Sequence, residues 1–235
     1  MPDRLEHIPA VILVGGLGTR LRAAVPDRQK VVAPVAGRPF VFRLLDQVAD
    51  AGLKRVVLCT GYKAEQVAES VGTKYRGLSI TYSSEPSPLG TAGALRHALS
   101  TIDAETMLAM NGDSFCEVDL GALWESHRQH QANATLVVVE VPQTREGGRV
   151  AIDDQGAITS FVEKGTSAGS GWISAGIYLL ARAVLASIPG DRAVSIERET
   201  FPAWVGRGLY AFKTSGKFLD IGTPESYTVA QQVFQ

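Results

Sequence analysis

The amino-acid sequence predicts an α/β fold in which helices flank a mainly parallel β-sheet. Over residues 10–141, short apolar runs rich in β-branched residues alternate with segments of helical periodicity. The loops between them are only a few residues long, as in layered α/β proteins. The first run, residues 10–14, has no polar side chain, which is typical of a strand buried on both faces of a parallel sheet.

The remaining segments of the first half follow the same alternation. A helix is expected at residues 39–51, because Leu44 and Val48 fall on one face and Gly52 provides a stop signal. We expect further strands at residues 55–60, 78–83, 106–110 and 134–141. We expect further helices at residues 64–71, 91–99 and 120–130.

From about residue 145 the pattern changes to shorter, mostly strand-like pieces. We expect strands at residues 149–152, 158–163, 172–180, 209–212 and 217–220, and helices at residues 181–187, 195–205 and 224–233. No low-complexity linker separates the two halves. We therefore expect one domain of residues 1–235, with lobes of about residues 1–145 and 146–235 that share a sheet.

The composition excludes several classes of protein. The chain has 235 residues, 45% of them apolar and 20% charged, with a net charge of −1. This is too apolar and too neutral for a disordered chain, and it gives no overall attraction to nucleic acid or to an anionic membrane. The polar N-terminus and the lack of a long apolar run predict a cytoplasmic protein with neither nucleic-acid nor membrane partners.

The cysteines and histidines suggest no metal centre. Cys59 and Cys116 lie far apart without a CxxC spacing, so a disulfide framework or zinc site is not expected, and Cys59 is interpreted as a core residue. His127 and His130 are three residues apart in a predicted helix, which could form half a metal site. Because no second pair completes it, we expect both on a solvated helix face.

The most informative motif is Gly-Gly-Leu-Gly-Thr-Arg-Leu at residues 15–21, directly after the first predicted strand. Glycines let the backbone approach a ligand and turn its N–H groups inward, and the Arg20 guanidinium adds a forked positive charge. These features suit a polyphosphate, although a tight turn with an incidental arginine would look similar. The motif lacks the Gly-Lys-Ser/Thr of a P-loop and the third glycine of a dinucleotide fingerprint.

Several further motifs occur in a fixed order along the chain, and together they resemble those of the sugar-1-phosphate nucleotidyltransferases. The loop just described is followed by Lys30 with Pro34 and by Gly-Arg-Pro at residues 37–39. The later motifs are Pro-Leu-Gly-Thr-Ala-Gly-Ala at 88–94, Asn-Gly-Asp at 111–113, Phe-Val-Glu-Lys at 161–164, Ser-Ala-Gly-Ile-Tyr at 174–178 and Phe-Leu-Asp-Ile-Gly-Thr-Pro at 218–224. The resemblance covers nearly the whole chain. Within the family it is strongest to the short GTP-using enzymes for D-glycero-D-manno-heptose 1-phosphate, followed by mannose-1-phosphate guanylyltransferases.

The resemblance implies a Rossmann-like fold of the nucleotide-diphospho-sugar transferase type. It also implies that the first lobe binds the nucleotide and the second the sugar. In this reaction a phosphate oxygen of a sugar 1-phosphate attacks the α-phosphorus of an NTP, and pyrophosphate leaves. Positioning and charge neutralisation dominate such chemistry, and Mg²⁺ is the expected cofactor. The expected partners are therefore an NTP, with GTP favoured, and a sugar 1-phosphate.

Carrying the family motifs onto this chain gives a set of expected site residues. The catalytic residues are Arg20, Lys30 and Asp113, and the metal ligands are Asp113 and Asp220. The nucleotide is expected to contact Leu13, Gly15, Gly16, Gly18, Thr19, Arg20, Glu85, Gly90 and Thr91. The sugar phosphate is expected to contact Asn111, Gly112, Glu163, Lys164, Ser174, Gly176 and Glu197. Taken alone, each aspartate could be a turn residue, and Glu163 with Lys164 could be an exposed charged pair.

Glu85 carries a prediction about the nucleobase. A carboxylate only accepts hydrogen bonds, and guanine offers two adjacent donors, its ring N–H and its amino group. Uracil and thymine offer one donor beside carbonyl oxygens, which a carboxylate would repel. Glu85 thus favours guanine, unless it is simply an exposed loop residue.

Two positions depart from the family pattern. Gln29 stands where most relatives have proline before the lysine, which predicts a less rigid loop around Lys30. Ser174 replaces the usual asparagine, and its shorter reach predicts an altered sugar preference.

Glu197 lies in Ser-Ile-Glu-Arg-Glu-Thr-Phe-Pro at 195–202, a segment similar to one in the mannose and heptose enzymes, although its serine could simply cap a helix.

Several alternatives remain open at this stage. The same chemistry could act on mannose 1-phosphate with GTP, or on a hexose 1-phosphate with UTP or dTTP. A non-catalytic regulatory subunit that binds a sugar nucleotide is a different class, which the full set of charged site residues argues against. The sequence allows a monomer or a homodimer, and the resemblance implies a role in cell-surface polysaccharide assembly.

Overall fold

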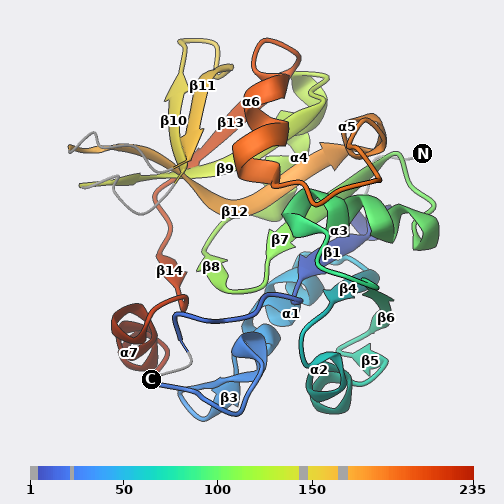
Figure 1. Ribbon diagram of the computed structural model, residues 1–235. Helices are drawn as coiled ribbons and strands as arrows, with labels where there is room; N and C mark the ends of the chain where they lie inside the picture. The colour runs from blue at the N-terminus through green and yellow to red at the C-terminus, as the bar shows by residue number, and fades with distance from the viewer. Residues whose placement is uncertain (1–4, 22–23, 143–147, 164–168) are drawn as a thin grey trace.

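The computed structural model describes residues 5–21, 24–142, 148–163 and 169–235 (Figure 1). Its α-helices are α1 (Val41–Asp50), α2 (Ala64–Val71), α3 (Gly90–Ala98), α4 (Leu120–Gln129), α5 (Arg182–Ala186), α6 (Phe201–Trp204) and α7 (Pro224–Val233). The strands of the main sheet are β1 (Ala10–Leu13), β4 (Arg55–Thr60), β5 (Lys74–Tyr75), β6 (Leu78–Ser84), β7 (Thr106–Asn111), β9 (Ala134–Val141), β10 (Gly148–Ile152), β11 (Ile158–Glu163), β12 (Gly171–Ala181) and β13 (Leu209–Thr214). Two small two-stranded sheets are formed by β2 (Pro34–Val35) with β3 (Arg38–Pro39) and by β8 (Ser114–Cys116) with β14 (Phe218–Asp220).

The main sheet is mixed and runs through both halves of the chain. The strands β6, β4, β1 and β7 lie side by side and run parallel, as the sequence predicts. The long strand β12 then pairs antiparallel with β7 and β9 and links the first half to β10 and β11. Antiparallel neighbours can follow short loops, and β10, β11 and β12 join the sheet in this way. The strand β13 instead pairs parallel with β9. The predicted boundary near residue 145 lies outside the described residues.

Helices cover both faces of the sheet, because successive side chains of a strand point to opposite faces. In β1, Ile12 packs in a core cluster with residues of α1, α2, α4 and α7, whereas Val11 packs with residues of α3, α5 and α6. This produces three layers, with the sheet in the middle (Figure 1). No helix in the described ranges is both long enough and apolar enough to cross a bilayer.

The segment predicted as one helix at residues 195–205 is instead two successive turns. A π-helical turn, Ile196–Thr200 (η4), leads directly into α6. Phe201 donates its N–H to Ile196 O, five residues back, and Pro202 has no N–H with which to continue an ordinary helix. The wider turn places Ser195 and Glu197 beside a cavity of the site described below.

The expectation for His127 is wrong. Its side chain is buried, and its Nδ1 lies 2.8 Å from Thr135 Oγ1 on β9. Burial lowers its pKa to about 4, which favours the neutral imidazole. His130 is exposed as expected and packs against Tyr210, with 4.4 Å between ring centroids. Only one of the two histidines therefore faces solvent.

Candidate active site

Two adjoining cavities lie beyond the carboxyl ends of the parallel strands, where ligands of such sheets bind. They share Gly90 and Thr91, which open α3. The first, of about 470 Å³, is lined by Leu13, Gly15, Gly16, Leu17, Cys59, Gly61, Tyr62, Glu85, Pro86, Ser87, Pro88, Gly90, Thr91 and Ala94, and we call it the β1 cavity. The second, of about 540 Å³, includes Arg20, Asn111, Asp113, Glu163, Ser174, Gly176, Glu197 and Asp220, and we call it the β12 cavity.

The glycine-rich loop follows β1 and rests on the neighbouring strand ends. Gly112 donates its N–H to Leu13 O at 2.9 Å, and Tyr62 donates its N–H to Gly15 O at 3.3 Å. Gly18 has a φ of +59°, which permits the turn that precedes Thr19. Gly15 and Gly16 line the β1 cavity, whereas Gly18 and Thr19 line neither cavity.

The Glu85 side chain is fixed within the β1 cavity. Its Oε2 accepts a hydrogen bond from Leu89 N at 3.0 Å. Its Oε1 lies so close to Gly61 that a Cβ on this glycine would be 2.6 Å away. Cys59 lines the same cavity and is buried as predicted, and burial raises the pKa of its thiol to about 12. The only carboxylate of this otherwise mostly apolar lining is therefore held in place by a backbone donor and a glycine.

Two aspartates meet through the small β8–β14 sheet. Asp220 pairs with Ser114, and Ile221 donates its N–H to Asp113 O at 2.9 Å. Ser114 Oγ lies 3.5 Å from one carboxylate oxygen of each aspartate. Burial and the nearby Asp113 charge raise the pKa of Asp220 above its ordinary value. The pairing thus holds two carboxylates together at an energetic cost that cations would offset.

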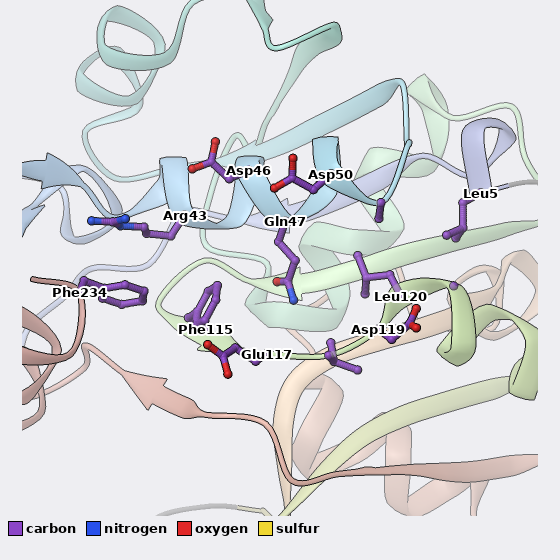
Figure 2. Close-up of a pocket in the computed structure, with 13 residues that line it drawn as sticks. Leu5, Arg43, Asp46, Gln47, Asp50, Phe115, Glu117, Asp119, Leu120 and Phe234 are labelled. Atoms are coloured by element: carbon purple, nitrogen blue, oxygen red, sulfur yellow. The ribbon is translucent and has the colours of Figure 1, made fainter.

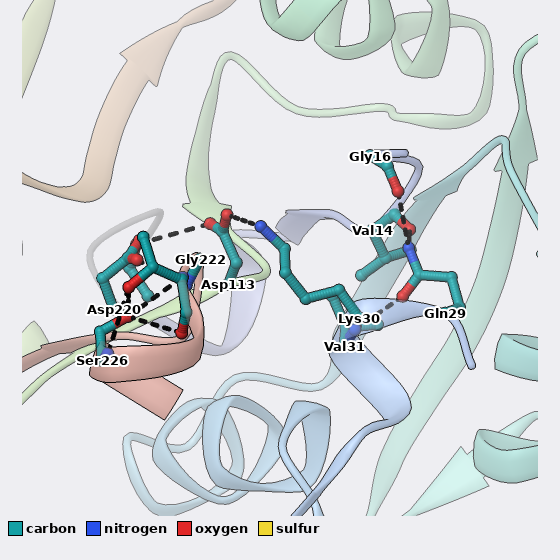
Figure 3. Close-up of polar contacts among 11 residues, drawn as sticks. Val14, Gly16, Gln29, Lys30, Val31, Asp113, Asp220, Gly222 and Ser226 are labelled. Atoms are coloured by element: carbon teal, nitrogen blue, oxygen red, sulfur yellow. Dashed lines mark hydrogen bonds and ion pairs between the residues drawn. The ribbon is translucent and has the colours of Figure 1, made fainter. Parts of the chain in front are cut away.

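Two cationic side chains surround this carboxylate pair. Lys30 Nζ forms an ion pair with Asp113 Oδ2, and its side chain is only 12% exposed (Figure 3). Arg20 is exposed and lines the β12 cavity, and its guanidinium packs close to Gly222, where a Cβ would lie 3.2 Å from Nη2. The predicted catalytic residues Arg20, Lys30 and Asp113 are therefore brought together.

The carboxylate pair suits Mg²⁺ by the chemistry of its donors. Magnesium prefers oxygen ligands and is commonly bound through one or two carboxylates together with substrate phosphates and waters. Asp113 and Asp220 supply two carboxylates, with the Ser114 hydroxyl between them. Among the described residues, no group of three or more His, Cys, Asp or Glu side chains forms an all-protein metal cage. The donor set fits an ion whose coordination shell is completed by substrate phosphates and waters.

A second cluster of polar groups lines the β12 cavity. Glu197 Oε2 accepts hydrogen bonds from Thr91 Oγ1 at 3.0 Å and from Ser195 Oγ at 3.2 Å. Burial raises the pKa of Glu197. Burial, together with the charge of Glu197, also raises the pKa of the Tyr178 phenol. Asn111 Oδ1 is buried and accepts no hydrogen bond from the described residues. These acceptors suit a ligand that carries hydroxyl donors.

Gly176 and Ser174 shape the floor of this cavity. Gly176 has a φ of +75° at an irregularity of β12, and a Cβ there would lie 3.0 Å from Asn111 Nδ2. Ser174 Oγ accepts a hydrogen bond from Gly176 N and lies 3.4 Å from the Tyr178 hydroxyl. The serine is thus engaged with its own strand.

Glu163 lies at the rim of the β12 cavity and forms an ion pair with Arg198 Nε. Arg198 also lines this cavity, which the sequence interpretation missed, although it directly follows Glu197 in a segment singled out there. Lys164, expected to contact the sugar phosphate, lies outside the described residues. Gly112 lines neither cavity, because its N–H is used by Leu13 and a Cβ would lie 2.3 Å from Leu13 O. Its contact with the sugar phosphate stays a prediction.

A third cavity, of about 600 Å³, lies away from these groups, between α1, β8 and the C-terminus (Figure 2). Arg43 stacks over the Phe234 ring at 4.6 Å, and Gln47 Nε2 donates to Cys116 O at 2.8 Å. None of the predicted site residues lines it. The predicted site residues that line one of these three cavities are all in the β1 and β12 cavities.

Known proteins are similar to this chain in sequence. The chain is 38% identical over 226 residues to a mannose-1-phosphate guanylyltransferase of Mycobacterium tuberculosis, covering 94% of this chain and 63% of that protein. It is 34% identical to the D-glycero-alpha-D-manno-heptose 1-phosphate guanylyltransferase of Aneurinibacillus thermoaerophilus, covering 96% of this chain and 98% of that one.

Solved structures agree with this fold. The crystal structure of HddC from Yersinia pseudotuberculosis matches with a TM-score of 0.85 and 33% identity, covering 97% of this chain and all of that one. A second structure of HddC, complexed with GMP-PN, matches with a TM-score of 0.84. The expected nucleotide-diphospho-sugar transferase fold is thus confirmed. The family model of the nucleotidyl transferases matches residues 9–235, and the chain therefore belongs to this family.

Proposed function

We propose that this protein transfers a guanylyl group from GTP to a sugar 1-phosphate and releases pyrophosphate. A phosphate oxygen of the sugar 1-phosphate attacks the α-phosphorus of GTP. The bond from that phosphorus to the bridging oxygen of the β-phosphate breaks, and pyrophosphate carries away the electron pair. No proton has to move, so positioning and charge stabilisation carry the catalysis.

The observation that carries this proposal is the Asp113–Asp220 pair in the lining of the β12 cavity, which adjoins the β1 cavity at Gly90 and Thr91. Both aspartates and Arg20 line the β12 cavity, and Lys30 is ion-paired with Asp113. We propose that the triphosphate of a nucleotide in the β1 cavity reaches these groups and meets the sugar phosphate there. Asp113 and Asp220 would hold Mg²⁺, which neutralises phosphate charge when bound. Arg20 and Lys30 would bind the triphosphate and stabilise charge that develops on it.

Guanine is the base that the β1 cavity fits best. Glu85 Oε2 is oriented by Leu89 N, and an acceptor-only carboxylate suits the ring N–H and amino group of guanine. The HddC structure with GMP-PN and the guanylyltransferase relatives support the same choice.

For the sugar, we propose D-glycero-α-D-manno-heptose 1-phosphate. The Aneurinibacillus relative, of which this chain covers 98%, is named for that substrate. Mannose 1-phosphate is the second candidate, because the Mycobacterium relative is named for it, although this chain spans less than two thirds of that protein. In either case Glu197 and Asn111 would accept hydrogen bonds from sugar hydroxyls, with Glu163 at the rim. Gly176 would let the sugar approach the backbone, and Ser174 would tune the preference.

The remaining proposals follow from this function. We propose that Lys164 pairs with the sugar phosphate, that the first lobe holds the nucleotide and the second the sugar, and that the protein works in the cytoplasm as a monomer or homodimer. Cell-surface polysaccharide assembly is the proposed use of the product.

Pyrophosphate release with Mg²⁺ tests the proposal. The four common NTPs are each combined with heptose, mannose, glucose and N-acetylated sugar 1-phosphates. Turnover with GTP and the manno-heptose is the expected result, and turnover with GTP and mannose 1-phosphate favours the second candidate. Turnover only with UTP or dTTP contradicts the base assignment. Binding of a nucleotide sugar without any turnover supports a regulatory subunit instead.

A further inference from the structure

Gln29 is buried at the centre of the loops that carry the phosphate-binding residues. The residue is 1% exposed. It directly precedes Lys30 (Figure 3). A buried glutamine is costly unless all of its polar groups are hydrogen-bonded. The contacts of Gln29 therefore show what this position does.

The side-chain amide and the backbone N–H of Gln29 together make four hydrogen bonds. Its Nε2 donates to Val14 O and, at 3.3 Å, to Gly16 O. Its Oε1 accepts a hydrogen bond from Val31 N at 2.6 Å. Its backbone N–H donates to Gln66 Oε1 on α2 at 2.7 Å. The orientation of the amide is unambiguous, because the flipped amide would turn its oxygen toward two carbonyl oxygens.

These contacts tie three separate elements together. Val14 directly precedes the glycine-rich loop and Gly16 belongs to it, whereas Val31 belongs to the 3₁₀ turn Lys30–Val32. Gln66 also donates its Nε2 to Asp27 O at 2.9 Å, so α2 contacts the segment on both sides of Arg28. The turn that presents Lys30 is thereby fixed both to the loop and to a helix.

A proline at position 29 would not provide these links. The φ of Gln29 is −65°, which a proline ring would also impose. Proline has neither an N–H nor a side-chain amide, so all four hydrogen bonds would be lost. The substitution of proline by glutamine was expected to loosen the loop, but the contacts indicate that the side chain braces it.

We propose that Gln29, supported by Gln66, is a positioning residue that sets the geometry of Lys30 relative to the glycine-rich loop. It contacts no reacting group itself. This inference rests on the proposed function, because it assigns Lys30 to the triphosphate. Small misplacement of a charged group is enough to lower turnover by about 10²-fold.

The test uses Gln29→Met, which keeps the shape but loses the amide, and Gln66→Met, which removes only the second link. Glu69→Gln, an exposed change on α2, is the matched control. Amide hydrogen exchange at Val31 is measured in the free protein, together with kcat and KM for GTP and the sugar 1-phosphate. Thermal unfolding and active-site titration give the folded, competent fraction of each variant.

For Gln29→Met we expect exchange at Val31 to be faster by about tenfold or more, kcat to fall by about 10- to 100-fold per competent site, and KM for the sugar 1-phosphate to be unchanged. Gln66→Met should change the same quantities less, and Glu69→Gln should change none. Unchanged exchange at Val31 in Gln29→Met, or a loss of kcat explained entirely by a smaller competent fraction, overturns the proposal. Hydrogen exchange at Val31 does not depend on turnover. A wild-type protein that does not process GTP would therefore contradict the proposed function, whereas the exchange rates would still show whether Gln29 holds the turn in place.

Discussion

The ammonium group of Lys30 is ion-paired with the carboxylate of Asp113, 83 positions further along the chain. The topology explains this distant pairing. Lys30 belongs to the turn held against the loop after β1, and Asp113 follows β7, which pairs parallel with β1 in the sheet. Two loops from adjacent parallel strands therefore bring opposite charges together at one sheet edge, beside Asp220.

Removing the Lys30 charge should affect the chemical step. We expect Lys30→Met to lower kcat by about 10²-fold or more, because a cation placed at the phosphates stabilises charge in the transition state. Lys30→Arg should retain part of the activity. The exposed Lys54→Met is the control. Steady-state kinetics with saturating GTP measure the effect, and a kcat of Lys30→Met within threefold of wild type would contradict this role.

The base assignment predicts a change of nucleotide preference in Glu85→Gln. The glutamine can offer a donor where the carboxylate offers only acceptors, so kcat/KM for GTP should fall by about 10- to 100-fold relative to that for UTP. Glu65→Gln on α2 is a matched change outside the cavities. The ratio of kcat/KM values for GTP and UTP is the measurement. An unchanged ratio would remove Glu85 from base recognition.

A methyl group at position 61 should act through Glu85. The added Cβ of Gly61→Ala would lie 2.6 Å from Glu85 Oε1, so the carboxylate must move. We expect KM for GTP to rise by about tenfold, as for a lost charge-assisted hydrogen bond. In a Glu85→Ala background the same change should have no further effect on KM. Equal effects in both backgrounds would show that Gly61 acts independently of Glu85.

The hydroxyl of Thr91 should matter for the sugar more than for the nucleotide. It donates to Glu197 Oε2 at 3.0 Å and accepts from Ile196 N at 2.8 Å. Thr91→Val removes both bonds at nearly constant volume, and we expect KM for the sugar 1-phosphate to rise by about tenfold. Thr91→Ser keeps the hydroxyl and should behave like wild type. If the two variants behave alike, the hydroxyl does not position Glu197.

Acid should destabilise the protein partly through His127. Its folded-state pKa is lowered to about 4, below an unfolded value near 6.5, so the unfolded state binds more protons between these values. The contribution of His127 to the free energy of unfolding is fully present above pH 6.5. It decreases as the pH falls toward 4, by at most about 3 kcal/mol. In His127→Phe the slope of unfolding free energy against pH should be shallower in this window. Chemical denaturation at pH 4.5, 5.5, 6.5 and 7.5 measures it, and an unchanged slope would contradict the assignment.

Elements with strong periodicity could be predicted from the sequence alone. The strand at residues 55–60 and the helix at 64–71 have the predicted bounds, because each combines an apolar pattern with a clear stop signal. The family resemblance also predicted that Asp113 and Asp220 belong to one site. Their separation in the sequence does not contain this spatial information.

Other features depend on contacts that no local pattern encodes. The pairing of β8 with β14 joins three-residue strands about 100 positions apart, and strands this short have no periodicity of their own. Gln29 is a polar residue in a loop, and only its burial among carbonyls distinguishes it from a surface glutamine. His127 did carry a signal, because Leu120, Leu123 and His127 follow the i, i+3, i+7 spacing of a buried helix face.

The fate of the α-phosphorus tests the central claim most directly. The protein is incubated with Mg²⁺, D-glycero-α-D-manno-heptose 1-phosphate and GTP labelled at the α-phosphorus, and the products are separated and counted. The account predicts that the label appears in a GDP-linked sugar, together with an equal amount of unlabelled pyrophosphate, and that Asp113→Asn abolishes both. Label recovered only as GDP or GMP, with no sugar nucleotide from either the heptose or the mannose 1-phosphate, would contradict it.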